Sequence, residues 1–360
     1  MQSIKHIPGY KNAHWIMDEM ELFYTEMSDD TKQGGLIQNV YDSSFKLLLD
    51  AFMKYGTKDF DGILFEDKPV ERLQLKSYNP KNIIVCYSGG KDSLAVVQHY
   101  QKMGYNVYAY HIKGLNKTYY DEWKVAETAA KELGFNLIFD EVAYVGQHTW
   151  VEHPMKNMIM ANMALTYGIQ HDITTKIACG SFYTAHLSDI EFSVCGGDSA
   201  DMWAIYDAII GQAIPNFHMH IPNKSYETAY NLILKKPELL PLTISCLTPN
   251  RFRDLFRKRT INNYSADLLP NRCGCCWKCA AEYLWFCDHN VLQYNRQYYI
   301  HCLEILVNTM EQENGYRTYR LQTVWENYLF YPMTKSKAYE ELKDAVILRN
   351  KIKVTSDFSS

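Results

Sequence analysis

Six consecutive residues have the types and spacing that phosphate binding requires: Ser88, Gly89, Gly90, Lys91, Asp92 and Ser93. The two adjacent glycines let backbone N–H groups reach a phosphate without side chains in the way. The serines add hydroxyl donors, Lys91 adds positive charge, and Asp92 can hold Mg²⁺ or orient a ligand. The segment differs from a Walker A loop, which ends in Gly-Lys-Ser/Thr, because Asp92 follows Lys91.

Cysteines form the second group with chemical potential, because four of the ten lie within residues 273–279. Gaps of two residues let Cys273, Cys276 and Cys279 turn toward one point, and Cys246 is the natural fourth ligand of a tetrahedral zinc site. Cys275 competes with Cys273, whose spacing is the more regular. A closed site with four thiolates would be structural, and an iron–sulfur cluster on the same ligands is the alternative.

Four of the five other cysteines are expected to be small buried side chains: Cys86, Cys179, Cys287 and Cys302. The N-terminal residues carry no export signal, which favours metal ligation over disulfides. No stretch is long and apolar enough to cross a bilayer, so a cytoplasmic protein is expected.

Composition places the chain among globular proteins, with 360 residues, 47% hydrophobic and 22% charged. The net charge of −4 argues against a broad surface for nucleic-acid phosphates and favours small substrates.

The elements that position the six-residue loop are readable on both sides of it. An apolar β-branched run, Ile83–Tyr87, predicts a buried strand, and Leu94–Met103 has helical spacing ended by Gly104. A second strand is predicted over Asn106–Ile112. The alternative is that these six residues are only a strand-to-helix turn with capping serines. We favour a phosphate loop, because the strand before it and the helix after it are the elements that such a loop needs.

The alternation of elements continues downstream. Helices are predicted at Asp121–Leu133 and Asn157–Tyr167, ended by Gly134 and Gly168, and strands at Asn136–Val142 and Thr174–Cys179, the second ended by Gly180. This pattern predicts a doubly wound parallel α/β sheet. The predicted organisation is a mainly helical extension over 1–78, based on the spacing in Leu36–Tyr55, the α/β domain over 79–245, the cysteine module over 246–289 and a helical extension over 290–360.

Ser88-Gly-Gly-Lys-Asp-Ser93 resembles the signature of the PP-loop, or adenine nucleotide α-hydrolase-like, superfamily. Its members bind ATP and cleave it between the α and β phosphates. The resemblance implies that the loop holds the pyrophosphate end of ATP and that backbone around Tyr110, His111 and Ile112 meets the adenine. Gly180 completes the implied nucleotide-binding set.

The order of several motifs between Asn82 and Phe286 is similar to that of 7-cyano-7-deazaguanine synthases. After the loop come Pro154-Met-Lys-Asn157, Ile177-Ala-Cys-Gly180, Ser245-Cys246 and the cysteine cluster. This likeness implies an ATP-dependent C–N ligase with structural zinc, which converts a carboxylated 7-deazaguanine into a nitrile with ammonia. Lys156 stands where that family has an arginine and is expected to meet a phosphate or carboxylate.

Departures from the family fall on the substrate side. Lys91 occupies a position that is usually uncharged, Asp198-Ser-Ala200 replaces an aspartate-cysteine-arginine segment, and Tyr226 stands where a lysine is expected, with Lys224 two positions earlier. The acceptor could therefore be a related carboxylate or one attached to a macromolecule. We expect catalytic roles for Lys91, Asp92 and Lys156, with ATP, Mg²⁺ and Zn²⁺ bound.

Two other functions stay open at this point. In the first, Cys179 or Cys195 carries sulfur to an adenylated nucleic-acid base. In the second, the chain is a nucleotide-binding subunit of a modification or defence complex and docks a partner through its extensions. A homo-oligomer or a complex subunit is expected.

Overall fold

The structure is a computed structural model that describes part of the chain: residues 56–59, 62–65, 77–113, 122–141, 156–180, 206–207, 210–211, 214, 216–220, 227–244, 269–272, 274 and 276–314. The chain divides into two compact units, Met1–Ala229 and Tyr230–Ser360. The predicted boundaries of the four regions stay predictions.

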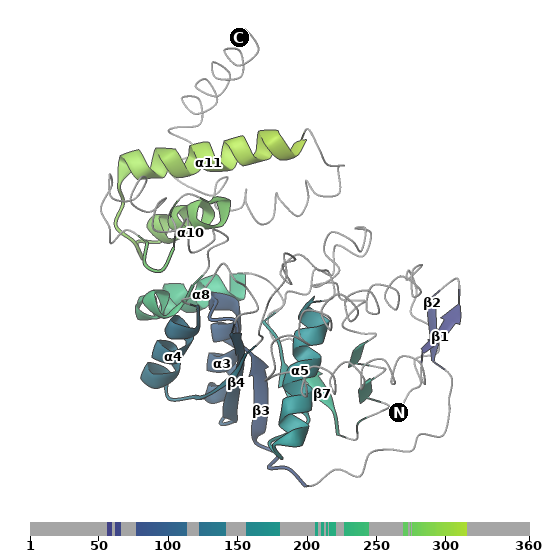
Figure 1. Cartoon of the computed structure of the whole chain (residues 1–360). Coiled ribbons are helices and arrows are strands. Elements are labelled where there is room, and N and C mark those ends of the chain that lie inside the picture. The colour runs from purple at the N-terminus through teal and green to yellow at the C-terminus, as the bar shows by residue number, and fades with distance from the viewer. Residues whose placement is uncertain are drawn as a thin grey trace. The chain divides into compact units, whose positions relative to one another are not determined.

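The first unit is built on a five-stranded, wholly parallel sheet (Figure 1). Its strands are β3 (Asn82–Cys86), β4 (Asn106–Lys113), β5 (Asn136–Glu141), β6 (Lys176–Ala178) and β7 (His218–His220). Their order across the sheet is β5-β4-β3-β6-β7. The chain first builds outward from β3 through β4 to β5, and then returns to the other side of β3. The predicted α/β class is thus confirmed, and the strand order is compatible with a Rossmann-like fold.

The central position of β3 in the sheet explains its apolar composition. Ile83, Ile84 and Val85 are at most 1% exposed, so side chains on both faces of this strand are buried. A strand covered on both faces has no polar face, and its residues form a continuous apolar run.

Helices pack on both faces of the sheet: α3 (Lys91–Lys102), α4 (Glu122–Leu133) and α5 (Lys156–Gln170). The α5 helix lies on the face of Ile84, where the added Cβ of a residue at Gly168 would come within 2.7 Å of Ile84 Cδ1. On the opposite face, Val85 aligns with Ala178 and His220, and His220 hydrogen-bonds the Tyr100 hydroxyl of α3. Side-chain alternation along the strands therefore separates the two helical layers.

Several predicted boundaries need correction. The helix expected to end at Gly168 continues to Gln170, because a glycine there lets α5 approach the Thr174 carbonyl and β3. The helix expected from Leu94 begins at Lys91, so half of the six-residue loop is its first turn. The strand expected over Thr174–Cys179 is limited to Lys176–Ala178. The short edge strand β7 was not predicted.

The described part of the N-terminal extension is an antiparallel hairpin of β1 (Gly56–Asp59) and β2 (Gly62–Phe65). The helical pattern at 36–55 lies outside the described residues.

The second unit is helical where it is described. The division between the units falls within α8 (Glu227–Lys235), which is followed by the 3₁₀ helix η3 (Pro237–Leu242), α10 (Trp277–Asp288) and α11 (Arg296–Asn314). Aromatic rings join α10 to α11, since the ring centroids of Tyr283 and Tyr298 are 4.5 Å apart. Helix α11 lies within the region predicted to be a helical C-terminal extension, and that region stays a prediction. None of the helices described is long and apolar enough to traverse a bilayer.

Candidate functional site

The glycine loop, residues 88–93, connects the carboxyl end of β3 to α3. Gly89 has a φ of +78°, a left-handed conformation that other residues rarely adopt, and Gly90 is the N-cap of α3. The helical hydrogen bonds begin with Leu94 N–H donating to Gly90 O at 3.0 Å. The amides of the first helical turn point outward from the helix end, where the helix dipole favours an anion.

Two serine hydroxyls fix the shape of the glycine loop. Ser93 Oγ donates to Gly90 O at 3.1 Å and accepts from Ser88 N–H at 3.3 Å. Ser88 Oγ accepts from Gly90 N–H at 3.4 Å. Ser93 is buried and Ser88 is exposed. Ser93 therefore stabilises the loop from inside, and Ser88 is the serine with access to a ligand.

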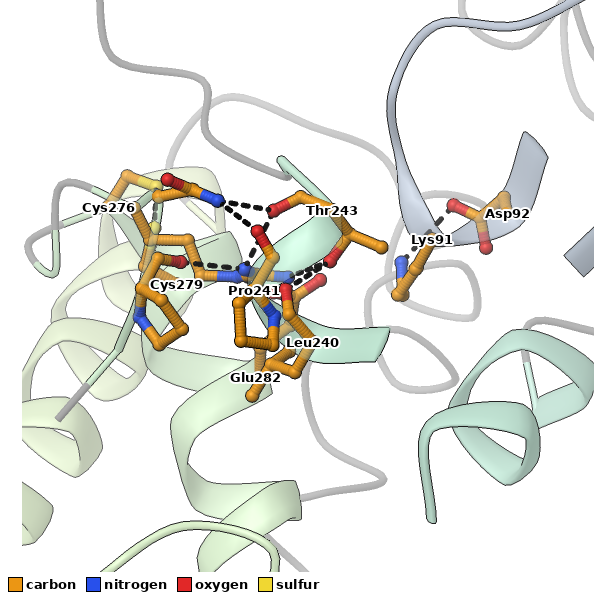
Figure 2. A network of polar contacts seen from close by, with 11 residues as sticks. Lys91, Asp92, Leu240, Pro241, Thr243, Cys276, Cys279 and Glu282 are labelled. Carbon is orange, nitrogen blue, oxygen red and sulfur yellow. Dashed lines mark hydrogen bonds and ion pairs between the residues drawn. The ribbon is translucent and has the colours of Figure 1, made fainter. Parts of the chain in front are cut away.

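Lys91 and Asp92 form an ion pair inside the first turn of α3. Lys91 Nζ lies 3.2 Å from Asp92 Oδ2, and their side chains are 4% and 24% exposed (Figure 2). A carboxylate in the first turn of a helix is favoured by the dipole, whereas a buried lysine there needs a neighbouring negative charge. Lys91, which is predicted to face a phosphate, thus also forms an ion pair with Asp92, the predicted Mg²⁺ ligand.

Gly180 is brought against the glycine loop, as its place in the predicted nucleotide-binding set requires. An added Cβ at Gly180 would lie 2.8 Å from Ser93 N and 2.9 Å from Asp92 C. These distances are shorter than real Cβ contacts. Only glycine lets the end of β6 approach the first turn of α3 this closely.

The end of β4 lies on the other side of β3. Tyr110, His111 and Ile112 are all buried. A contact between their backbone and an adenine stays a prediction. Tyr110 donates a hydrogen bond to Asp140 Oδ2 at 2.5 Å, and burial together with the Asp140 charge raises the pKa of Tyr110 well above its usual value. The Tyr110 hydroxyl thus stays protonated and is engaged within the protein.

The predicted nucleotide-binding residues therefore gather at one edge of the sheet, at the carboxyl ends of β4, β3 and β6. The strand order reverses between β3 and β6. Lys156 is the first residue of α5, and its side chain lies outside the described residues.

Two thiols lie close to this edge. Because Val85 pairs with Ala178, the next residues follow side by side: Cys86 is the last residue of β3, and Cys179 comes directly after β6. Tyr206 lies near both thiols. Burial raises the pKa of Tyr206 well above its usual value, and the charges that Cys179 and Cys86 can carry raise it further. Cys179 is buried and Cys86 is partly exposed, and neither is in a disulfide. Cys195 lies outside the described residues.

The cysteine cluster is described in part. Cys276 is the N-cap of α10, Cys279 lies in its first turn, and their sulfur atoms are 3.3 Å apart. A disulfide would bring the sulfurs to about 2.05 Å, whereas a tetrahedral zinc site separates them by about 3.8 Å. Cys287 and Cys302 are buried as expected, and burial raises the pKa of Cys287 to about 11.

Within the described residues, no three or more His, Cys, Asp or Glu side chains form a group that could hold a metal. Three predicted or competing ligands lie outside those residues: Cys246, Cys273 and Cys275.

A buried ion pair lies between Arg272 and Glu282, and hydrogen bonds of the same arginine reach Thr243. Arg272 Nε lies 2.5 Å from Glu282 Oε2, and both side chains are 0% exposed. The Arg272 guanidinium also donates to Thr243 O at 3.3 Å and to Thr243 Oγ1 at 3.1 Å (Figure 2). Burial lowers the pKa of Arg272, but the Glu282 charge, the hydrogen bond to Glu282 and the charges that Cys279 and Tyr230 can carry together outweigh burial and leave the pKa raised. The arginine is thus charged and fully engaged.

This network joins chain positions that adjoin two of the predicted ligands. Thr243 is three residues before Cys246, and Arg272 directly precedes Cys273. Tyr298 Oη donates to Gly274 O at 2.7 Å and ties α11 to the same segment.

Sequence reasoning missed Arg272 and Glu282. A signal existed for the second, because Glu282 is a lone acidic residue within the otherwise apolar stretch Ala280–Cys287. Such a position indicates a buried charge that needs a partner. The partner is ten residues away and could not be chosen from spacing alone.

No model of a known protein family matches the sequence, and no curated protein matches it significantly.

Proposed function

We propose that this chain is a PP-loop ATP pyrophosphatase that adenylates a substrate carboxylate and transfers the activated acyl group to ammonia or an amine. The observation that carries the proposal is the position of the glycine loop at the carboxyl end of β3, with Gly180 packed against its first helical turn. Open parallel sheets bind ligands outside the carboxyl ends of their strands, where the strand order reverses. We propose the doubly wound PP-loop fold together with this function.

The loop offers a ready site for the pyrophosphate end of ATP. Its N–H groups, the dipole of α3 and the exposed Ser88 hydroxyl all favour an anion. The hydrogen bonds of Ser93 hold this arrangement before ATP arrives. Donors that are already oriented need no reorganisation when negative charge develops on the departing pyrophosphate.

Lys91, Asp92 and Lys156 supply the charges. The Asp92 side chain is 24% exposed, and carboxylate oxygens are the ligands that Mg²⁺ prefers, so Asp92 fits the role of metal ligand beside the ATP oxygens. Bound Mg²⁺ would neutralise negative charge on the leaving group. Lys91 keeps a positive charge at the same turn, and Lys156 at the start of α5 steadies the adenylate.

The reaction balances without a redox partner. A carboxylate oxygen attacks the α-phosphorus, the bond from that phosphorus to the bridging oxygen breaks, and pyrophosphate leaves. Ammonia then attacks the carbonyl carbon of the mixed anhydride, loses a proton, and AMP leaves with the second oxygen. For a carboxylated 7-deazaguanine, a second adenylation of the amide and loss of AMP would give the nitrile.

The cysteine module is proposed to be a structural zinc site of Cys246, Cys273, Cys276 and Cys279. Its support is that Cys276 and Cys279 are in no disulfide and that their sulfur atoms lie 3.3 Å apart, together with the hydrogen bonds between Arg272 and Thr243. Four thiolates leave zinc no open position, so the metal would stabilise the module without touching substrate.

AMP release tests the proposal. The purified chain is incubated with ATP, Mg²⁺, ammonium and a panel of carboxylated 7-deazapurines, and the products are separated. We expect AMP and pyrophosphate, with a loss of about 100-fold or more in Asp92→Asn. Glu127→Gln, an exposed acidic position on α4, is the matched control and should retain activity. Release of ADP and phosphate would contradict the proposal.

Sulfur transfer is the second candidate, and the pair of Cys86 and Cys179 favours it. Cys179 would take a sulfane sulfur from a donor persulfide by thiol exchange. Attack of the Cys86 thiolate on the inner sulfur would release hydrosulfide, which displaces AMP from the adenylated base, and would leave a Cys86–Cys179 disulfide for an external dithiol to reduce. Loss of product formation in Cys179→Ser, with a persulfide on the wild type by mass spectrometry, would support this function. The remaining candidate is a subunit that binds nucleotide without catalysis. AMP production by the purified chain alone would count against it.

A further inference from the structure

The residue before the glycine loop is held by a side chain of the neighbouring strand. Tyr87 N–H donates to Tyr110 O at 2.9 Å, and Tyr87 O accepts a hydrogen bond from His111 Nδ1 at 2.9 Å. A carbonyl oxygen can only accept, so the proton of this contact must be on Nδ1. The His111 imidazole thus donates a hydrogen bond to Tyr87, the first residue after β3.

The His111 ring is itself fixed. It is 3% exposed, and its centroid lies 5.8 Å from that of Phe139, edge to face. Phe139 pairs with His111 in the β4–β5 register, and Trp123 of α4 packs edge-on against Phe139. A buried ring that packs against Phe139 and bonds Tyr87 O keeps the direction of its N–H group.

One peptide plane transmits this contact to the loop. The Tyr87 carbonyl and the Ser88 N–H belong to the same planar unit, so fixing one end fixes the other. Ser88 N–H donates to Ser93 Oγ, which in turn donates to Gly90 O. His111 therefore stands at the start of a chain of hydrogen bonds that ends at the N-cap of α3.

We infer that His111 is a positioning residue, which sets the orientation of the glycine loop for the ATP phosphates through the Tyr87–Ser88 peptide. The inference rests on the proposed function. The side chain acts from within the protein and does not touch the nucleotide, so its role differs from that of the backbone at the end of β4.

Two substitutions separate positioning from packing. In His111→Asn the amide nitrogen can occupy nearly the position of Nδ1 and keep the donor. In His111→Leu the volume is better filled but the donor is lost. A role in packing alone predicts that Leu is the better replacement for ATP binding, whereas positioning predicts that Asn is.

The experiment measures the dissociation constant of Mg·ATP by calorimetry for wild type and both variants, with the melting temperature of each. We expect His111→Asn to stay within about threefold of wild type, and His111→Leu to bind ATP about tenfold more weakly or worse, even where Leu melts higher. Equal affinities of the two variants, or tighter binding by Leu, would overturn the inference.

Amide hydrogen exchange without nucleotide gives a second readout. Exchange across residues 88–93 should be faster in His111→Leu than in His111→Asn. Identical exchange in the two variants would contradict the positioning role. A wild type that binds no ATP would instead refute the proposed function, so the two failures are distinguishable.

Discussion

The glycine loop and the cysteine module place their chemical groups over very different distances along the chain. In the glycine loop, the hydrogen bonds among Ser88, Gly90 and Ser93 connect residues at most five positions apart. In the cysteine module, Arg272 bonds Thr243 across 29 positions. The loop can take its shape from local bonds, whereas the module depends on a buried charge pair and, in our proposal, on a metal. Substitutions should therefore damage the two regions to different degrees.

The largest effect is expected for loss of the proposed zinc. Cys279→Ser should reduce bound zinc from one ion per chain to none, and the second unit should unfold, because structural zinc contributes about 10 kcal/mol or more in small modules. Cys287→Ala is the control, since this buried thiol lies outside the proposed ligand set. Metal content is measured by mass spectrometry. Zinc retained by Cys279→Ser would break the comparison, and iron in the wild type would favour the cluster alternative.

The next effect concerns the buried ion pair. Arg272→Met leaves the Glu282 charge buried without its partner and should destabilise the second unit by about 3–5 kcal/mol. The double variant Arg272→Met with Glu282→Leu removes both charges and should recover much of that loss. Chemical denaturation of the three proteins measures the difference. A double variant as unstable as the single one would show that the Thr243 contacts, and not the charge pair, hold the module.

Gly180→Ala should disturb the glycine loop at one defined point. The new Cβ would collide with the backbone of Asp92 and Ser93, so the first turn of α3 must shift. We expect the dissociation constant for ATP to rise about 10- to 100-fold, equal to about 1.4–2.8 kcal/mol. Gly211→Ala, where the nearest atom would be 3.9 Å away, is the matched control. Unchanged ATP binding in Gly180→Ala would show that this contact does not define the site.

The smallest effect is a pH dependence at the other end of α3. Burial, followed by the charges of His218 and His99, lowers the pKa of His220. The unfolded chain therefore takes up this proton at a higher pH than the folded chain, and stability falls as pH drops below about 6.5. His220→Gln should lose less melting temperature than wild type between pH 7.5 and 5.5. Equal losses would exclude His220 as the group responsible.

The range of contacts also explains what the sequence could predict. The run Ile83–Val85 and the glycine loop are contiguous, so β3, the loop and α3 were predicted, with α3 beginning three residues early. Gly168 was misread as a helix end because its purpose, a close approach to Thr174 and Ile84, depends on tertiary packing. The three-residue strand β7 is too short to leave a pattern of alternation.

The candidate site divides in the same way. Ser88–Ser93 and Gly180 were named from the sequence and lie together, because the sheet brings the ends of β3 and β6 side by side. The support from His111 and Arg272 was not predicted. A histidine in a strand and an arginine before a cysteine carry no local sign of their partners, which are 24 and 29 residues away in Tyr87 and Thr243.

A crystal structure with α,β-methylene ATP and Mg²⁺ tests the central claim most directly, since this analogue resists cleavage between the α and β phosphates. Our account predicts phosphate oxygens within about 3 Å of the amide nitrogens of the glycine loop, with the adenine beside the backbone of residues 110–112. A nucleotide bound elsewhere, or a glycine loop without phosphate at saturating analogue, would contradict it.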